Sequence, residues 1–172
     1  MAMVQGSQAP TSRVLARRVT RADWEWIQRW YADETLDREL GPLDTDWLEH
    51  VLSSTEGVQL VIEAAHPATG LLAPIAIVGV AWGDESSGHG ITDLAIDPAR
   101  RGYGLGRTAI DATIAWPEHP PTTSWIAFVD QDNTGARSFF TAIGWSYEGL
   151  DGEGDDAMHR FATTRPVRPA DN

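Results

Sequence analysis

The stretch Asp93-Leu-Ala-Ile-Asp-Pro-Ala-Arg-Arg-Gly-Tyr-Gly-Leu-Gly-Arg107 reads as a strand, a glycine-rich turn and the first turn of a helix. The apolar run ends at Asp97-Pro98, because proline cannot continue a central ladder of hydrogen bonds. Three alternating glycines follow, and they let the backbone pass close to a ligand. Residues 107–116 then carry apolar side chains at helical spacing, so the free amides of a helix start face the turn. Because such amides and the helix dipole attract anions, the stretch predicts a phosphate cradle.

Other glycine-rich loops need companion residues that this chain lacks. All thirteen basic residues are arginines, so a P-loop, a lysine Schiff base and a kinase-type lysine are excluded. The spacing Gly102-x-Gly104-x-Gly106 lies past the middle of the chain, and an apolar run near residue 126 stands where a dinucleotide site would need an acidic strand end. A turn without a ligand is the default for a glycine cluster, but the arginine pair Arg100-Arg101 at its entrance argues for an anion.

Two segments together resemble the GNAT family of N-acetyltransferases. Arg101-x-x-Gly104-x-Gly106, shortly after Asp97-Pro98, resembles the loop with which that family binds the pyrophosphate of acetyl-CoA. The segment Asn133 to Trp145 resembles the family's next block, in which an asparagine opens a helix and a glycine-aromatic pair closes it. Both blocks occur in the family's order and at the family's separation, and the resemblance extends over residues 13–164.

The periodicity of the chain predicts an α+β fold in the order βααβββαβαββ, which is also the order of the GNAT fold. We expect a mixed, mostly antiparallel central sheet with helices on both faces. The expected strands are 13–19, 58–64, 75–82, 91–97, 124–129, 145–147 and 158–161. The expected helices start at 20–23, at 47, at 107 and at Asn133, whereas the acidic stretch 33–46 is expected to be irregular.

Composition bounds the architecture and the partners. The length of 172 residues suits a single domain, expected at 13–164 with a disordered start at 1–12 and a frayed tail from 165. Without a signal peptide or a long apolar run, the chain is expected to be soluble and cytoplasmic. The absence of cysteine excludes disulfides, thiolate metal sites and a cysteine nucleophile, and we expect no metal. A net charge of -12 disfavours nucleic acid and anionic membranes as partners.

The resemblance implies acetyl-CoA as cosubstrate and assigns its contacts by position. In the family, the strands equivalent to 91–97 and 124–129 splay apart, and the pantetheine arm lies in the gap between them. Here the arm would lie along Leu94, Ala95 and Ile96, with the amide near Ile96 as a donor to the thioester oxygen. Asn133 would contact the arm, although simple helix capping explains an asparagine there equally well. The remaining cofactor-binding residues, which would hold the pyrophosphate, are Arg101, Gly102, Tyr103, Gly104, Leu105, Gly106 and Arg107.

The proton-transfer groups depart from the family pattern. The resemblance implies direct attack of an amine on the thioester, which needs a base for the amine and an acid for the thiolate. Phe140 stands where the family's usual tyrosine acid would be, and Gly90 stands where several members place a glutamate. The nearest candidate bases are His89 and Asp93, acting directly or through a water. Their alternative roles are a solvated turn residue for His89 and an outward-facing strand residue for Asp93.

The acceptor is suggested only by charge. In the family the first inter-helix loop and the last hairpin flank the acceptor entrance, and here these are the acidic stretches 33–46 and 151–156. They favour a small cationic amine such as a polyamine or aminoglycoside, or a basic peptide, although acidic loops are usually only solvated surface. Trp30 and Tyr31 would lie beside this entrance. An N-terminal protein acetyltransferase and a non-catalytic acyl-CoA-binding module stay open as alternatives, as does a homodimer.

Overall fold

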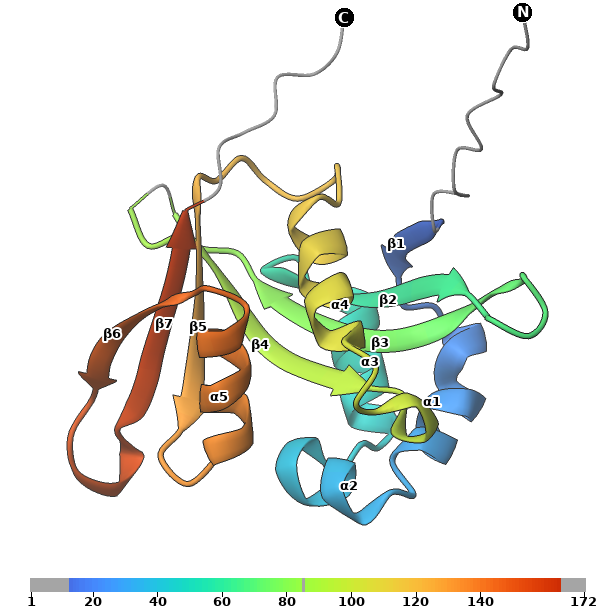
Figure 1. The fold of residues 1–172 in the computed structure, drawn as a ribbon, viewed down its shortest axis with the longest axis horizontal. Coiled ribbons are helices and arrows are strands. Elements are labelled where there is room, and N and C mark those ends of the chain that lie inside the picture. The colour runs from blue at the N-terminus through green and yellow to red at the C-terminus, as the bar shows by residue number, and fades with distance from the viewer. Residues whose placement is uncertain (1–12, 85, 165–172) are drawn as a thin grey trace, which may run out of the picture.

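The computed structural model describes residues 13–84 and 86–164, and this part of the chain forms a seven-stranded sheet in the order β1-β2-β3-β4-β5-β7-β6 (Figure 1). All neighbouring strands are antiparallel except β4 and β5, which are parallel. The strands are β1 Val14–Arg18, β2 Gly57–Ala65, β3 Leu72–Ala81, β4 His89–Ile96, β5 Ser124–Asp130, β6 Ser146–Asp151 and β7 Met158–Thr164. The predicted α+β fold with a mixed, mostly antiparallel sheet is confirmed.

Helices cover both faces of this sheet (Figure 1). Helices α4 (Leu105–Ile114) and α5 (Thr134–Ala142) pack on one face, and α1 (Trp24–Trp30), α2 (Glu34–Leu40) and α3 (Thr45–Ser53) pack on the other. None of the described helices is long and apolar enough to cross a bilayer. The disordered start expected at 1–12 and the frayed tail expected from 165 lie outside the described residues.

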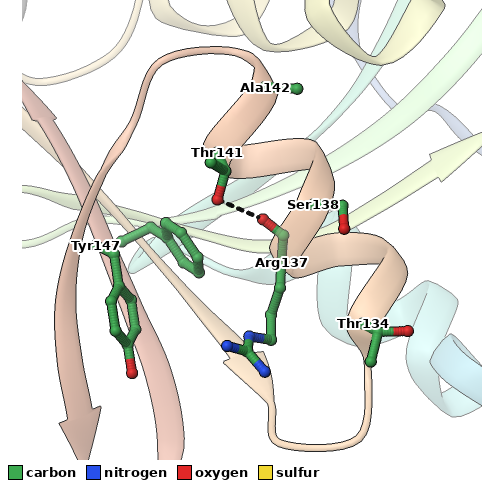
Figure 2. A pocket seen from close by; sticks show the side chains of 7 residues that line it. Thr134, Arg137, Ser138, Thr141, Ala142 and Tyr147 are labelled. Carbon is green, nitrogen blue, oxygen red and sulfur yellow. Dashed lines mark hydrogen bonds between the residues drawn. The ribbon is translucent and has the colours of Figure 1, made fainter.

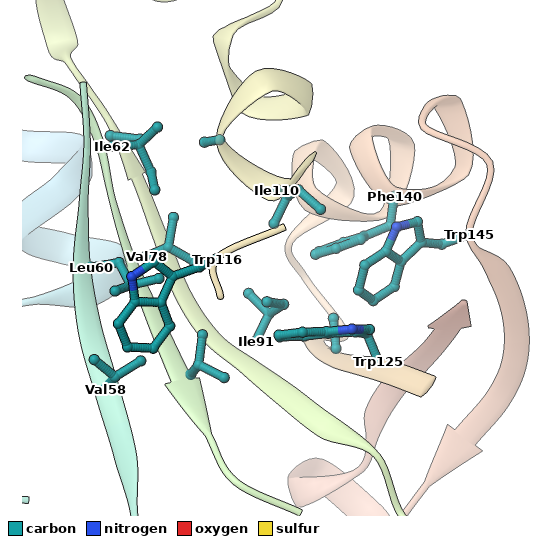
Figure 3. Close-up of a cluster of buried hydrophobic side chains, with 14 of the residues drawn as sticks. Val58, Leu60, Ile62, Val78, Ile91, Ile110, Trp116, Trp125, Phe140 and Trp145 are labelled. Atoms are coloured by element: carbon teal, nitrogen blue, oxygen red, sulfur yellow. The ribbon is translucent and has the colours of Figure 1, made fainter. Parts of the chain in front are cut away.

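Two cores result from the alternation of side chains along the central strands. Leu60, Ile62 and Val78 point toward α4, in the larger core that Figure 3 shows. Val61 and Ile77 point to the opposite face, under helices α1 to α3. Because β2 and β3 are covered on both sides, their sequences are apolar almost without interruption.

The stretch 33–46, expected to be irregular, contains the helix α2, so the element order gains one helix. The Asp33 side chain caps α2 by accepting hydrogen bonds from the amides of Thr35 and Leu36. Leu36 is buried and Leu40 packs beside it, one turn further on the same face. With only two apolar residues at helical spacing among many acids, the periodicity was too weak to predict this helix.

Candidate active site

The parallel strands β4 and β5 pair over only three residues each and then diverge. His89–Ile91 pairs with Trp125–Ala127, and beyond these residues β4 continues toward the glycine-rich turn without β5 beside it. A bulge at Thr92, where Gly79 of β3 faces Asp93 and the next pair is Val80 with Ile91, bends β4 at the point of divergence. The sheet therefore opens next to the predicted cradle.

Backbone groups of β4 face this opening. The Asp97 amide donates to the Ile75 carbonyl on the β3 side, at 3.0 Å. Because successive residues of a strand direct their backbone groups to alternate sides, those of Leu94 and Ile96 face the β5 side, where no described strand pairs with them. Ala95, predicted to join them, directs its backbone groups toward β3, and its side chain is buried in the core under α1 to α3. Of the three residues, Leu94 and Ile96 can offer hydrogen bonds to a molecule in the opening.

The turn at the end of β4 has the backbone geometry of an anion cradle. Gly102 and Gly104 adopt left-handed conformations, with φ of 83° and 73°, and a Cβ atom at either would meet nothing within 4 Å. Gly104 is the N-cap of α4 and offers no side chain to cap it, so the first amides of that helix are left to an external acceptor. Tyr103 between the two glycines is 78% exposed. The loop can therefore hold a phosphate group by its backbone alone.

The arginines of this loop differ in what they contact. Arg101 makes a bidentate ion pair with Asp33, with Nη1 at 3.1 Å from Oδ2 and Nη2 at 2.7 Å from Oδ1. Nη2 of Arg107 donates to the Ala142 carbonyl at the end of α5, at 3.0 Å. Nη1 of Arg100 is buried and has no hydrogen-bond partner. Arg101 and Arg107, both predicted to hold the pyrophosphate, thus have protein partners for their side chains.

The third glycine of the loop serves helix packing. Gly106 lies in the first turn of α4, and a Cβ atom there would come within 2.7 Å of the Phe139 ring of α5. Leu105, the first residue of α4, packs against the larger core. Gly106 and Leu105 thereby position the cradle relative to α5. Their contribution to the predicted site is indirect.

Asn133 occupies the position of a helix cap. It is the N-cap of α5, and its Oδ1 accepts a hydrogen bond from the Ala136 amide at 2.9 Å. The cap uses only the oxygen of the side chain, so the NH₂ group can still donate to a ligand. Both roles considered for Asn133 are compatible with this geometry.

His89 lies inside the protein and not in a solvated turn. It is the first residue of β4, fully buried between the rings of Trp82 and Trp125. Its Nδ1 accepts from the Gly83 amide at 3.2 Å, and its Nε2 is 2.8 Å from the Pro120 carbonyl, to which it donates. Burial lowers the pKa of His89, which keeps the ring neutral. Because both ring nitrogens are engaged, the geometry speaks against the role of base predicted for His89.

Asp93 points to the face covered by α1 to α3 and is partly buried beside the opening. Its Oδ1 accepts from Gln59 Nε2 at 2.7 Å, and its Oδ2 accepts from the Thr92 hydroxyl at 3.1 Å. Gly79, opposite on β3, leaves room for the carboxylate. Burial raises the pKa of Asp93. The pKa of Tyr31 is also raised, first by burial and then by the negative charge of Asp93, so Tyr31 lies near the carboxylate.

The two departures from the family pattern have different surroundings. Phe140 is buried in an aromatic cluster with Trp145 and Phe161, where it has no hydroxyl to donate a proton. Gly90 is nearly unobstructed, since a Cβ atom there would meet only Ile126, at 3.8 Å. Neither position supplies an acid or a base.

The acidic stretches flanking the expected entrance are partly engaged in structure. Asp33 caps α2 and pairs with Arg101, and Asp44 caps α3 through the amide of Trp47. In the last hairpin, Asp151 lies 3.7 Å from Arg160. A separate surface hollow between α5 and the strands β6 and β7 contains none of the predicted site residues (Figure 2).

Gln59 lies at the candidate site but was not among the residues predicted from the sequence. A glutamine in the run Val58-Gln-Leu-Val-Ile interrupts an otherwise apolar buried strand, and this was a usable signal. Its partner Asp93 is 34 residues away, so only the strand register could join the two.

A splayed strand pair that leads into an anion cradle is the architecture that the family resemblance implied. Residues 13–146 match the acetyltransferase (GNAT) domain family. The chain therefore belongs to the GNAT acetyltransferases, and its enzyme class is acyl-CoA N-acyltransferase. No protein of curated function matches the chain by sequence.

Known structures share the fold at low sequence identity. Aminoglycoside acetyltransferase AAC(6')-Ib in complex with coenzyme A is 19% identical with a TM-score of 0.70, over 89% of this chain and 95% of that chain. An acetyltransferase from Thermus thermophilus is 19% identical with a TM-score of 0.68, over 88% and 97%. A spermidine N-acetyltransferase SpeG chimera from Vibrio cholerae and hSSAT is 17% identical with a TM-score of 0.61, over 88% and 95%.

Proposed function

We propose that the protein transfers an acetyl group from acetyl-CoA to the primary amine of a small cationic molecule, such as an aminoglycoside or a polyamine. The observation that carries the proposal is the opening between β4 and β5, with a phosphate cradle at its end and the Asp93 carboxylate beside it on the other face. Donor and acceptor would thus reach the same point from opposite faces of the sheet.

The cradle and the free edge of β4 fit coenzyme A. The pyrophosphate would be held by amides of the loop from Gly102 to Leu105, and the pantetheine arm would bond to the backbone of Leu94 and Ile96. The Ile96 amide would then donate to the thioester oxygen. Acetyl-CoA supplies an activated acetyl group with a thiolate as leaving group. The protein has only to bind, orient and move protons.

Asp93 is our candidate for the general base. Its carboxylate would take one proton from the incoming ammonium, and the neutral nitrogen would then bond to the acetyl carbon. As the carbon–sulfur bond breaks, the second proton lost by nitrogen would pass through water to the thiolate. Burial raises the pKa of Asp93 and thereby makes it a better proton acceptor than an exposed aspartate. Because Phe140 has no proton to donate, water would protonate the departing thiolate.

Charge supports a cationic acceptor. The chain carries a net charge of -12, and among the described residues no cationic side chain pairs with Asp93. Structures of similar fold include an aminoglycoside acetyltransferase and a spermidine N-acetyltransferase chimera.

A thiol-release screen with acetyl-CoA tests this proposal. We expect release with kanamycin or spermidine, and a fall in kcat of about a hundredfold or more for Asp93→Asn, because a positioned base contributes about that much. The control Glu25→Gln changes an exposed carboxylate of α1 to an amide and should keep full activity. Full activity in Asp93→Asn would exclude Asp93 as the base.

A second candidate, a non-catalytic acyl-CoA-binding module, is favoured by the buried Phe140. It predicts binding of coenzyme A with no thiol release on any amine. An N-terminal protein acetyltransferase instead predicts release with peptides and none with free amines, so a peptide panel in the same screen separates the three.

A further inference from the structure

Gln59 is a polar side chain in a core strand, only 7% exposed. The register of the sheet aligns Gln59 of β2, Gly79 of β3 and Asp93 of β4 in one row on the face toward α1. Burying an amide is costly unless it is hydrogen-bonded, and the Gln59 NH₂ group donates to Asp93 Oδ1 at 2.7 Å. Among the described residues, the candidate base Asp93 is the hydrogen-bond acceptor for this amide.

Gly79 and Thr92 complete a niche around the same carboxylate. A Cβ atom at position 79 would overlap Oδ2 of Asp93 and the hydroxyl of Thr92, so only glycine leaves this space free. The bulge at Thr92 brings its hydroxyl within 3.1 Å of Oδ2. Residues from three strands thus hold one carboxylate in one orientation.

The groups that face Asp93 are all neutral. They are Gln59 from β2, Gly79 from β3, Thr92 from β4 itself and Tyr31 from α1. Two other carboxylates near α1 and α2 have arginine partners: Asp23 has Arg17 at 2.8 Å, and Asp33 has Arg101 at 2.7 Å. In contrast, the Asp93 carboxylate has no cationic partner among the described residues, and a partly buried anion of this kind gains most from a cation that arrives with the substrate.

We propose that Gln59 is the positioning residue that holds Asp93 as an unpaired anion beside the β4–β5 opening, where it receives the acceptor amine in its ammonium form. The inference rests on the proposed function. Its substrate class is strongly basic amines, which enter protonated and give one proton to the carboxylate before nitrogen attacks. Weakly basic aromatic amines, which carry no charge at neutral pH, should be poor acceptors.

The test measures kcat/KM from pH 6 to pH 9 for wild type, Gln59→Met, Gln59→Glu and Asp93→Asn, with acetyl-CoA and kanamycin or spermidine. Gln59→Met keeps the length of the side chain and removes the donor. Since the hydrogen bond stabilises the ionised carboxylate, we expect the acid limb to move to higher pH, with kcat/KM at pH 6.5 lower by about tenfold and a smaller loss at pH 9. Gln59→Glu places a second carboxylate there and should move the limb further.

Thr113→Val is the matched control, because it removes a buried hydroxyl that bonds only within α4, to the Ala109 carbonyl. Thr113→Val should leave the acid limb of the kcat/KM profile at the wild-type pH. The affinity for coenzyme A should be unchanged in every variant. If Gln59→Met does not fold, Gln59→Leu removes the same donor with another apolar side chain and answers the same question.

Three results overturn the inference and remain distinguishable. If the acid limb of the kcat/KM profile in Gln59→Met lies at the wild-type pH, or if kcat/KM falls equally at every pH, Gln59 does not position Asp93, and the rest of the proposal stands. If the acid limb of the kcat/KM profile is unchanged in Asp93→Asn, Asp93 is not the base either, but the protein still transfers acetyl groups. Absence of thiol release with any amine removes the proposed function itself.

Discussion

His89 illustrates at the level of one residue how burial redirects a chemically capable side chain. A histidine next to a glycine-rich turn is a plausible base by sequence, but its ring is closed between tryptophans and bonded at both nitrogens. Protonation would set Nδ1–H against the Gly83 amide, two donors facing each other. The residue therefore locks the start of β4, and its effect belongs to stability.

This role predicts a pH dependence of stability. Because burial lowers the pKa of His89 below its ordinary value of 6.5, the unfolded chain binds more protons than the folded chain below that pH. The contribution is fully present above about pH 6.5 and is lost as the pH falls below it. Urea unfolding at pH 7.5 and 5.5 should show a drop in the wild type and a smaller drop in His89→Gln. An equal drop in the two proteins would contradict this role.

The sequence predicted Asp93 as a candidate base but did not predict the residues that surround it. Its position before the cradle marked it as a candidate base, and its surroundings now favour it. Its partners Gln59, Gly79 and Tyr31 could not be predicted, because they depend on strand register, a bulge and the packing of α1.

At the scale of elements, α2 is tied to the glycine-rich loop after β4 through its cap residue. Its cap residue Asp33 also makes the bidentate pair with Arg101 of the cradle, which lowers the pKa of Asp33 to about 2. The same carboxylate thus fixes a helix start and a loop 68 residues away. The ion pair with Asp33 thereby fixes the position of the cradle relative to α2.

This coupling predicts non-additive substitutions. Asp33→Ala removes the cap and the pair, whereas Arg101→Ala removes only the pair. The double variant should therefore have the same melting temperature as Asp33→Ala alone. Asp44→Ala removes the cap of α3, so its effect and that of Arg101→Ala should simply add. Additive losses for Asp33 and Arg101 would show that the pair contributes nothing to stability.

Elements with strong periodicity or distinctive turns were predicted well, and weakly patterned ones were not. The seven strands and the helices at α4 and α5 lie close to where alternation and glycines placed them. Helix α2 was missed because its stability comes from a cap, two leucines and a tertiary ion pair, none of which gives a periodic signal. The divergence of β4 from β5 followed from the family resemblance, since pairing over three residues leaves no mark in composition.

At the scale of the whole molecule, a single sheet separates the two halves of the proposed reaction. Helices α4 and α5 and the cradle lie on the donor side, and α1 to α3 with Asp93 lie on the acceptor side (Figure 1). The opening between β4 and β5 is where the two sides meet. We therefore expect this opening and the cradle at its end to bind coenzyme A.

Titration calorimetry can measure the binding of coenzyme A to the wild type, Gly104→Val and Gly70→Val. Both glycines have positive φ, 73° and 70°, with open space around them, so both valines carry a similar backbone strain. Gly70 lies in the turn between β2 and β3 and belongs neither to the cradle nor to the β4–β5 opening. We expect wild type and Gly70→Val to bind alike and Gly104→Val to bind at least about tenfold more weakly, because the cradle can no longer present its amides. Unchanged binding in Gly104→Val, or no binding in the wild type, would contradict the account.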